Sequence, residues 1–193
     1  SRRIGERNLD DVDAEQRSFV ARGIEAAFEL EASELAPEYL AGLRRMVEEG
    51  QSITELHLAH NSLSGSGVSA ICTTIASISQ LALLDVSGNK IGKCGAEAVG
   101  SWLEAQTGVR TLRLAKCELG DRSVGCVISA LVKHKALTSV DLSANGIGSM
   151  VLHPLRGHSG ATPSVRALAD CMRYNMVLEE LDLSWNSLSG EHV

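Results

Sequence analysis

The sequence is poor in aromatic residues, contains no long apolar run and has no block of basic charge. Aromatic residues make up 3% of its 193 residues although 44% are apolar, so aliphatic side chains are expected to fill the interior. No stretch approaches the roughly 18 apolar residues that span a membrane. The net charge of −6 without a basic cluster argues against nucleic acid as the main partner. No secretory signal is visible, and the start at Ser1 suggests a trimmed or partial chain.

The motifs of common catalytic sites are also missing. The sequence has no GxSxG nucleophile turn, no HExxH metal-binding helix, no phosphate-binding P-loop and no CxxC pair. His57 and His60 are close enough in sequence to suggest a metal site, but no third ligand accompanies them. We therefore expect no enzyme activity, no metal, no cofactor and no small-molecule substrate.

The sequence does contain a repeat. Each unit reads apolar-x-x-apolar-x-apolar-x-x-Asn-x-apolar, and its first strand position is occupied by Leu56, Leu84, Leu112, Val140 and Leu181. The corresponding turn positions are Asn61, Asn89, Cys117, Asn145 and Asn186. Successive units are 28 residues apart, except that the last interval is 41 because of a 13-residue insertion. Such a regular spacing predicts a repeat architecture.

Within each unit the spacing predicts a short strand followed by a helix. Leu84 and Val86 are two residues apart, so both side chains point to one face of a strand. After the turn, Gly95, Val99 and Leu103 follow at helical spacing. The leucines of strand and helix are expected to pack against one another and against neighbouring units.

The turn asparagine is predicted to connect the units. A buried carboxamide such as that of Asn89 carries donors and an acceptor, so it can bridge the backbones of successive units. An apolar residue there would leave buried backbone groups unpaired, at a cost of roughly 1–3 kcal/mol each. Cys117 is interpreted as a small, weakly polar substitute.

This pattern resembles the leucine-rich repeat family, and the 28-residue unit is similar to its ribonuclease-inhibitor-type subclass. The resemblance covers about residues 24–193. It implies an α/β solenoid of horseshoe shape, with a parallel sheet on the concave face and helices on the convex face. Many members of the subclass act as scaffolds in larger assemblies, including cytoskeletal and ciliary ones.

The cysteines indicate a reducing compartment. They are odd in number and lie at unrelated positions of the repeat: Cys72, Cys94, Cys117, Cys126 and Cys171. Secreted leucine-rich repeat proteins usually carry capping clusters of cysteines, and none is visible here. We predict a cytoplasmic protein in which each cysteine is a small buried hydrophobe.

Residues 1–52 depart from the regular pattern. They are predicted to form a charged lead-in followed by a degenerate capping repeat, because terminal repeats of solenoids are atypical. In that repeat, Phe28 and Leu30 stand 28 residues before Leu56 and Leu58, and Pro37 is placed at the start of the helix.

The regular repeats of residues 53–193 are interrupted by an inserted loop at 149–163. Its glycines, prolines and histidines suit an exposed loop on one rim of the solenoid. The loop is either a tolerated surface insertion or a partner-specific hook. In the second case, the contacts are assigned to His153, Arg156 and His158.

Two columns of exposed residues define the candidate contact surface. The position between the two buried leucines of each strand reads Glu29, His57, Asp85, Arg113, Asp141 and Asp182. The position three residues later reads His60, Gly88, Lys116, Ala144 and Trp185. The columns form either a solvated ladder of weak pairs or an acidic recognition strip. Trp185 is either a binding anchor or packs on a downstream unit. Our candidate partner-binding residues are His57, Asp85, Arg113, Lys116, Asp141, Asp182 and Trp185.

The function expected from the resemblance is non-catalytic protein–protein interaction. The chain is predicted to be a scaffold or regulatory subunit of a multi-subunit intracellular assembly, with protein partners and no nucleic acid or membrane partner. One alternative is an activator of the GTPase Ran, which would need an exposed asparagine or arginine constellation and an acidic tail, and neither is visible. The other is the sensor region of an innate immune receptor, which requires a nucleotide-binding domain elsewhere.

Overall fold

The computed structural model describes residues 18–20, 37–50, 52–148 and 162–188. Its strands form one six-stranded sheet in the order β1-β2-β3-β4-β5-β6, and every neighbouring pair is parallel. The strands are β1 (Ser18–Val20), β2 (Glu55–His57), β3 (Leu83–Asp85), β4 (Thr111–Arg113), β5 (Ser139–Asp141) and β6 (Glu180–Asp182). The helices are α1 (Pro37–Glu48), α2 (Gly65–Thr74), the short 3-10 helix η2 (Ile75–Ser77), α3 (Gly92–Ala105), α4 (Gly120–Lys133) and α5 (Pro163–Tyr174).

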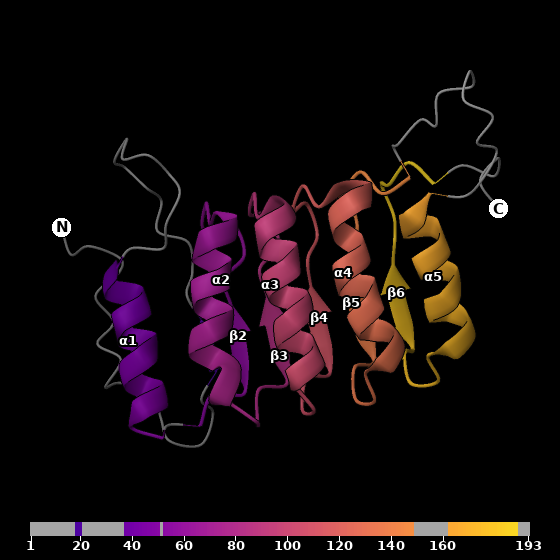
Figure 1. Ribbon diagram of the computed structural model, residues 1–193. Helices are drawn as coiled ribbons and strands as arrows, with labels where there is room; N and C mark the ends of the chain where they lie inside the picture. The colour runs from indigo at the N-terminus through magenta and orange to yellow at the C-terminus, as the bar shows by residue number, and fades with distance from the viewer. Residues whose placement is uncertain (1–17, 21–36, 51, 149–161, 189–193) are drawn as a thin grey trace.

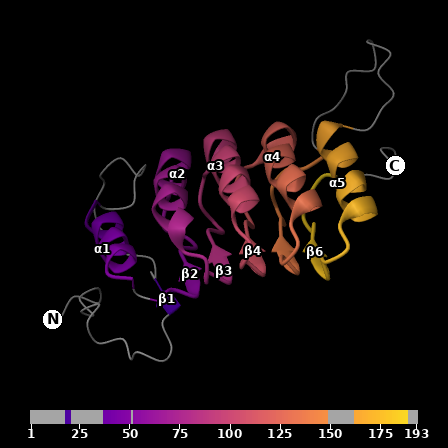
Figure 2. The same ribbon diagram turned by 60° about the horizontal axis from the view of Figure 1, so that its bottom comes forward.

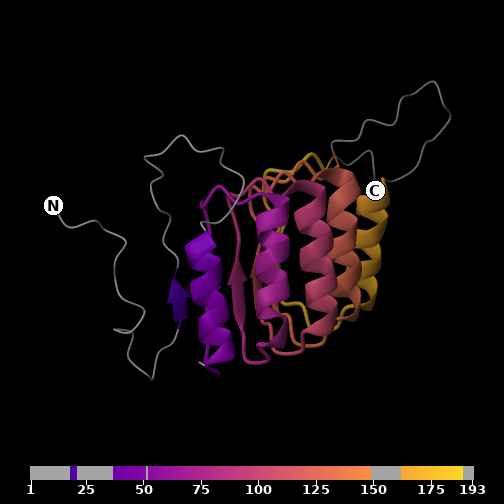
Figure 3. The ribbon, with the colours of Figure 1, turned by 60° about the vertical axis from the view of Figure 1, so that its left-hand side comes forward.

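The molecule has two layers. Figure 1 shows the helices side by side in chain order, all on one face of the sheet, and Figure 3 shows the same two layers from the side. The helices fan out more widely than the strands in Figure 2, so the array is curved with the sheet on its concave face. The predicted α/β solenoid with a concave parallel sheet and convex helices is confirmed.

The core lies between these layers. Residues at the same position of successive repeats lie next to one another and form a column through it. Adjacent strands pair without a shift, so Leu56, Leu84, Leu112, Val140 and Leu181 lie side by side across the sheet. The first four of these are at most 2% exposed. Burial of a whole leucine side chain contributes about 1.5–3 kcal/mol, and this aliphatic column explains why so few aromatic residues are needed.

The turn asparagines bridge the units as predicted. Asn89 is fully buried, and its Oδ1 accepts hydrogen bonds from the backbone N–H groups of Asn61 (3.0 Å) and Leu63 (2.9 Å) in the preceding unit. Its Nδ2 donates to the carbonyl oxygens of Leu58 (2.9 Å) and Val86 (2.7 Å). One side chain therefore satisfies four backbone groups from two units, in three buried hydrogen bonds and one partly buried one.

Cys117 replaces this asparagine only in part. Its Sγ donates weakly to the carbonyl of Val86 at 3.4 Å. A thiol offers no good acceptor, and the N–H of Ile91 instead donates to the carbonyl of Asn89 in its own turn at 3.0 Å. Cys117 is fully buried, and burial raises the pKa of its thiol to about 12, so the thiol stays neutral.

The assignment of every cysteine to the interior is wrong for two of the five. All five are free; Cys72, Cys117 and Cys171 are buried, whereas Cys94 and Cys126 are exposed on α3 and α4. Those two side chains face solvent rather than the core. Burial raises the pKa of Cys72 to about 12.

The N-terminal strand differs from the predicted one. β1 pairs with β2, and Phe19 lies opposite Leu56. The predicted strand residues Phe28 and Leu30 are outside the described residues, but the place beside β2 that they were assigned is occupied by β1. Helix α1 does begin at Pro37, as predicted.

The helix after the insertion begins at Pro163, one residue earlier than predicted. Thr162 caps it, since its Oγ1 accepts a hydrogen bond from the N–H of Val165 at 3.4 Å. Proline suits the first helical position because its missing N–H would have no intrahelical partner there.

A buried carboxylate in α4 holds both ends of this insertion. Asp121 is 5% exposed, and its Oδ1 accepts hydrogen bonds from the N–H of Gly148 (2.8 Å) and the hydroxyl of Thr162 (3.3 Å). The hydroxyl of Ser164 donates to the same oxygen. The helix of one unit thus ties together the two points where the additional residues leave and rejoin the repeat.

Candidate functional site

The strands place the first predicted column on the concave face in the expected order. His57, Asp85, Arg113, Asp141 and Asp182 are direct neighbours across the sheet, one from each of β2 to β6. The position assigned to Glu29 lies outside the described residues, and Val20 is the residue paired with His57.

The charged and polar side chains of the N-terminal half of this column are engaged in internal pairs. His57 Nε2 lies 3.0 Å from Glu55 Oε2, and Arg113 Nη1 lies 3.8 Å from Asp85 Oδ2. The expectation that the whole column is solvent-exposed is wrong for Asp85, which is only 9% exposed. The charge of Arg113 is thus partly offset by Asp85.

The C-terminal half of the column is different. Asp141 is half-buried and Asp182 is exposed, and within the described ranges neither carboxylate makes an ion pair. Their strands pair so that the two residues lie opposite each other. Two like charges in this arrangement repel each other, and an incoming cation would relieve that repulsion.

The aspartates also have a structural role that the sequence analysis missed. Each accepts a hydrogen bond from the N–H two residues later: Asp85 from Ser87 (3.0 Å), Asp141 from Ser143 (2.9 Å) and Asp182 from Ser184 (2.8 Å). The recurring Asp-x-Ser sequence was the available signal. The backbone and side-chain hydrogen bonds from Ser184 also lower the pKa of Asp182, so this carboxylate stays ionised at neutral pH.

The second column lies in a left-handed turn after each strand. The φ angles are 58° at His60, 69° at Gly88, 54° at Lys116, 54° at Ala144 and 57° at Trp185. Non-glycine residues adopt this conformation at a cost of roughly 1–2 kcal/mol each. At Gly88 an added Cβ would lie 2.2 Å from His60 Nδ1, so a side chain there would require the exposed His60 ring to move.

Trp185 is the most prominent side chain of this face. It is 89% exposed despite its size, and Lys116 in the same column is exposed too. We refer to Asp141, Asp182 and Trp185 together as the acidic–aromatic patch. The predicted loop contacts His153, Arg156 and His158 lie outside the described residues.

The described part of the chain shows neither a metal-binding cluster nor a membrane-spanning helix. There, no cluster of three or more His, Cys, Asp or Glu side chains has an arrangement that could hold a metal ion. His57 is paired with Glu55, and His60 covers Gly88. Among the described helices, none is long and apolar enough to cross a bilayer.

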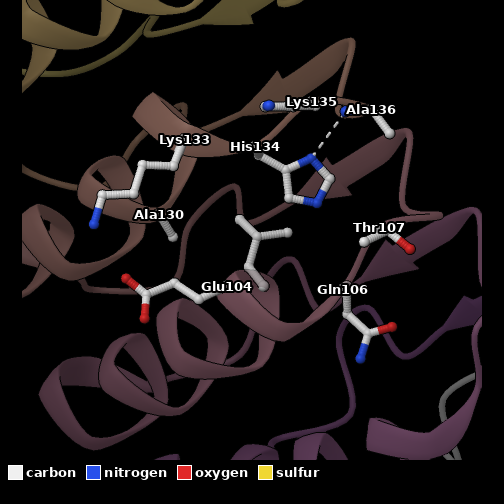
Figure 4. A pocket seen from close by; sticks show the side chains of 9 residues that line it. Glu104, Gln106, Thr107, Ala130, Lys133, His134, Lys135 and Ala136 are labelled. Atoms are coloured by element: carbon white, nitrogen blue, oxygen red, sulfur yellow. Dashed lines mark hydrogen bonds between the residues drawn. The ribbon is translucent and has the colours of Figure 1, made fainter.

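A pocket that the sequence analysis missed lies where α3 and α4 end. It has a volume of about 460 Å³ and is lined by Leu103, Glu104, Gln106, Thr107, Ala130, Lys133, His134, Lys135 and Ala136. In Figure 4 the imidazole of His134 has Gln106 and Thr107 on one side and Glu104 and Lys133 on the other. His134 is only 7% exposed.

Stability is expected to depend on the protonation of His134. Its Nδ1 accepts hydrogen bonds from the N–H groups of Ala136 (3.2 Å) and Leu137 (3.0 Å). Burial lowers the pKa of His134 below its usual 6.5, and the nearby Gln106 carbonyl opposes this only in part. Lys133, Lys135 and Glu104 are the charged groups around the pocket.

As the pH falls below about 6.5, the unfolded chain therefore binds a proton that the folded His134 does not. We expect the free energy of unfolding, measured by urea denaturation, to be lower at pH 5.5 than at pH 7.5. The decrease should be smaller in the His134→Asn variant. An identical pH dependence in both proteins would show that His134 does not contribute.

The repeats match a known family, and the fold matches a known structure. A family model described as "Leucine Rich repeat" matches residues 51–72, 81–100 and 174–191. The solved structure of "Leiomodin-1 Actin-Binding Site 2 (ABS2)" is similar with a TM-score of 0.64. The two share 14% identity, and the alignment covers 81% of this chain and 84% of that one. No sequence match to a curated protein was found.

These similarities agree with the geometry. Strand, turn and helix recur along one parallel sheet with helices on a single face, and buried asparagines connect successive turns. The chain therefore folds as a leucine-rich repeat solenoid.

Proposed function

We propose that this chain is a non-catalytic protein-interaction module whose concave face binds a protein partner through the acidic–aromatic patch. The observation that carries the proposal is Trp185, a large aromatic side chain that is 89% exposed in the left-handed turn after β6. Exposed aromatic residues on pre-organised surfaces are typical binding anchors, because little entropy is lost when they are buried.

The charges of the patch indicate a basic partner segment. Asp141 and Asp182 have no cation within ion-pair distance among the described residues, while Arg113 is engaged with Asp85. An arginine of the partner could pair with these carboxylates and stack on the indole of Trp185.

The proposed setting is a multi-subunit intracellular assembly of cytoskeletal or ciliary type, in which the chain acts as a scaffold or regulatory subunit. The repeats are assigned to the ribonuclease-inhibitor-type subclass on the spacing of their units. The structural neighbour is by its name an actin-binding site, so actin is the first partner to test. At 14% identity the likeness concerns the fold, and the proposal stands on the patch.

The experiment is a pull-down from source cells and a co-sedimentation assay with actin filaments. The test variant combines Trp185→Ala with Asp182→Asn, and we expect it to lose the captured proteins, with at least about tenfold weaker binding. Alanine already occupies the same left-handed turn position at residue 144, and asparagine retains the acceptor for Ser184. The fold should therefore survive both changes.

A matched control is Met176→Ala. Met176 is 91% exposed, yet it belongs to the connection between α5 and β6 rather than to the concave columns. Its removal should leave binding unchanged. Equal binding by the patch variant and the wild type would rule out this surface.

A further inference from the structure

The repeat unit that contains α5 and β6 carries the exposed apolar surface of the molecule. Among the side chains that the structure describes, every exposed large hydrophobic one belongs to this unit: Met172, Tyr174, Met176, Trp185 and Leu188. Leu181 and Leu183 are half-buried, whereas the residues at their positions in β2 to β5 are at most 2% exposed. β6 is the last strand of the described sheet and pairs only with β5 there (Figure 1). Its other edge is therefore where this apolar surface is uncovered.

The same edge of β6 offers unused backbone donors. In the units of β2 to β5, the N–H groups two and four residues after the first buried strand residue donate to carbonyls of the next unit. The corresponding groups of the last unit are the N–H groups of Leu183 and Trp185, and neither donates to a described residue. The N–H groups of Asn186 and Leu188 likewise receive no asparagine oxygen of the kind that Asn89 provides to the unit before it.

The junction between β3 and β4 shows which kind of strand fits such an edge. Residues 84–87 read Leu-Asp-Val-Ser and residues 181–184 read Leu-Asp-Leu-Ser, so β3 and β6 present nearly the same sequence to a following strand. Both aspartates accept a hydrogen bond from the N–H of the serine two residues later. β4 meets β3 with a basic residue, since Arg113 Nη1 lies 3.8 Å from Asp85 Oδ2. A strand with arginine at this position would meet Asp182 in the same way.

The charges and the aromatic ring at this edge favour a basic strand over an acidic one. Asp141 lies on the other side of Asp182, so an acidic residue beside Asp182 would place a third carboxylate in the row. Trp185 stands where the unit of β3 has Gly88, and the next residue along that column is Lys116. A lysine or arginine at the corresponding place would lie beside the exposed indole, which attracts cations.

We propose that a protein partner adds a parallel strand to the free edge of β6, with an arginine beside Asp182 and a second basic residue beside Trp185. Apolar residues on either side of that arginine would cover Leu181 and Leu183. In such strand addition, main-chain hydrogen bonds supply affinity and alternate side chains supply specificity. This inference rests on the proposed function, because it uses two residues of the acidic–aromatic patch, and it adds the backbone of β6 to the interface.

The probe is a peptide copied from the unit that fits β3. It has the sequence of residues 109–119 with asparagine in place of the cysteine, Val-Arg-Thr-Leu-Arg-Leu-Ala-Lys-Asn-Glu-Leu, and both of its ends are blocked. We expect the 193-residue chain to bind it saturably, with a Kd of about 1 mM or below. Hydrogen exchange at the N–H groups of Leu183 and Trp185 should slow on binding. A peptide with glutamate at the positions of Arg113 and Lys116 should bind at least about tenfold more weakly.

N-methylated peptides distinguish strand addition from binding through side chains alone. In β4 the N–H of Thr111 donates to Ala82 of the preceding unit at 3.0 Å, whereas the N–H of Leu114 donates to Asp141 of the following unit at 2.8 Å. Methylation of the peptide nitrogen at the Thr111 position should therefore weaken binding at least about tenfold. Methylation at the Leu114 position should leave binding unchanged. Equal binding of the two methylated peptides would overturn strand addition and leave the acidic–aromatic patch in place.

Two variants of the protein test the side chains of the edge. Asp182→Asn and Trp185→Ala should each weaken binding of the probe peptide. Unchanged binding by both variants would contradict the proposed function as well as the added strand. Failure of the probe to saturate below about 5 mM would overturn the added strand alone.

Hydrogen exchange in the free protein tests the other occupants of the edge. We expect the N–H groups of Leu183 and Trp185 to exchange rapidly at every protein concentration. Exchange that slows as the concentration rises would assign the edge to a second copy of the chain. Slow exchange at every concentration would assign it to the protein's own chain. Either result overturns the proposal.

Discussion

Replacement of Asn89 by leucine is expected to lower the free energy of unfolding by about 4 kcal/mol. The substitution removes one acceptor shared by two backbone N–H groups and a donor shared by the carbonyls of Leu58 and Val86. Three of these four hydrogen bonds are buried and the one from Asn61 is partly buried, so water can replace little of what is lost. Equilibrium urea denaturation at neutral pH measures the effect.

Asn186→Leu is the matched comparison. Asn186 bonds to the N–H groups of Asn145 (2.9 Å) and Ile147 (3.0 Å) and to the carbonyls of Leu142 (2.9 Å) and Leu183 (3.0 Å). Asn186 is only half-buried, so water can form hydrogen bonds with some of the backbone groups that lose their partner in the mutant. We expect roughly half the loss seen for Asn89→Leu. Equal losses would show that burial does not set the strength of these bridges.

The second large effect is expected from Gly65→Ala, which should lower the free energy of unfolding by about 2–3 kcal/mol. Gly65 is the first residue of α2, and an added Cβ would lie 2.5 Å from the carbonyl oxygen of Ile91 and 2.9 Å from the nitrogen of Gly95. Both are backbone atoms of the next unit. Relief therefore requires α2 and α3 to move apart, which disturbs the core between them.

Gly125→Ala provides the control in the same measurement. Gly125 lies inside α4, and an added Cβ meets no atom within 4 Å. Alanine restricts the unfolded chain and is the better helix former, so the variant should be about 0.5–1 kcal/mol more stable. A lower free energy of unfolding for Gly125→Ala, or an unchanged one for Gly65→Ala, would contradict the close contact between α2 and α3 and the open space beside Gly125.

Where the sequence predicted the structure well, the relevant contacts repeat. Leu56 meets Leu84 across the sheet, and Leu84 meets Leu112 in the same way, so a single periodic pattern describes each unit and its neighbour. The bridging role of Asn89 followed from the same regularity, because only a carboxamide offers both donors and an acceptor at a buried turn. The candidate concave residues could be ordered for this reason.

The prediction was weaker where a unit departs from its neighbours. The strand beside β2 is Ser18–Val20, which was not the predicted strand. A degenerate N-terminal repeat carries too little periodic signal to locate its strand from the sequence. The expected exposure of Asp85 was wrong, since its burial depends on contacts that strand alternation does not describe. The pocket at His134 was missed because its lining residues come from two helix ends, 23 or more residues apart in the sequence.

The sequence by itself determined the solenoid, its strand register from β2 to β6 and its asparagine bridges, because each depends on local periodicity and the chemistry of one residue type. Only the tertiary structure decided which charges are free. It pairs Arg113 with Asp85, leaves Asp141 and Asp182 without such a partner among the described residues, and buries a histidine with an unused donor. These properties depend on distances between side chains of different units, and a repeat pattern specifies the order of such side chains but not their separations.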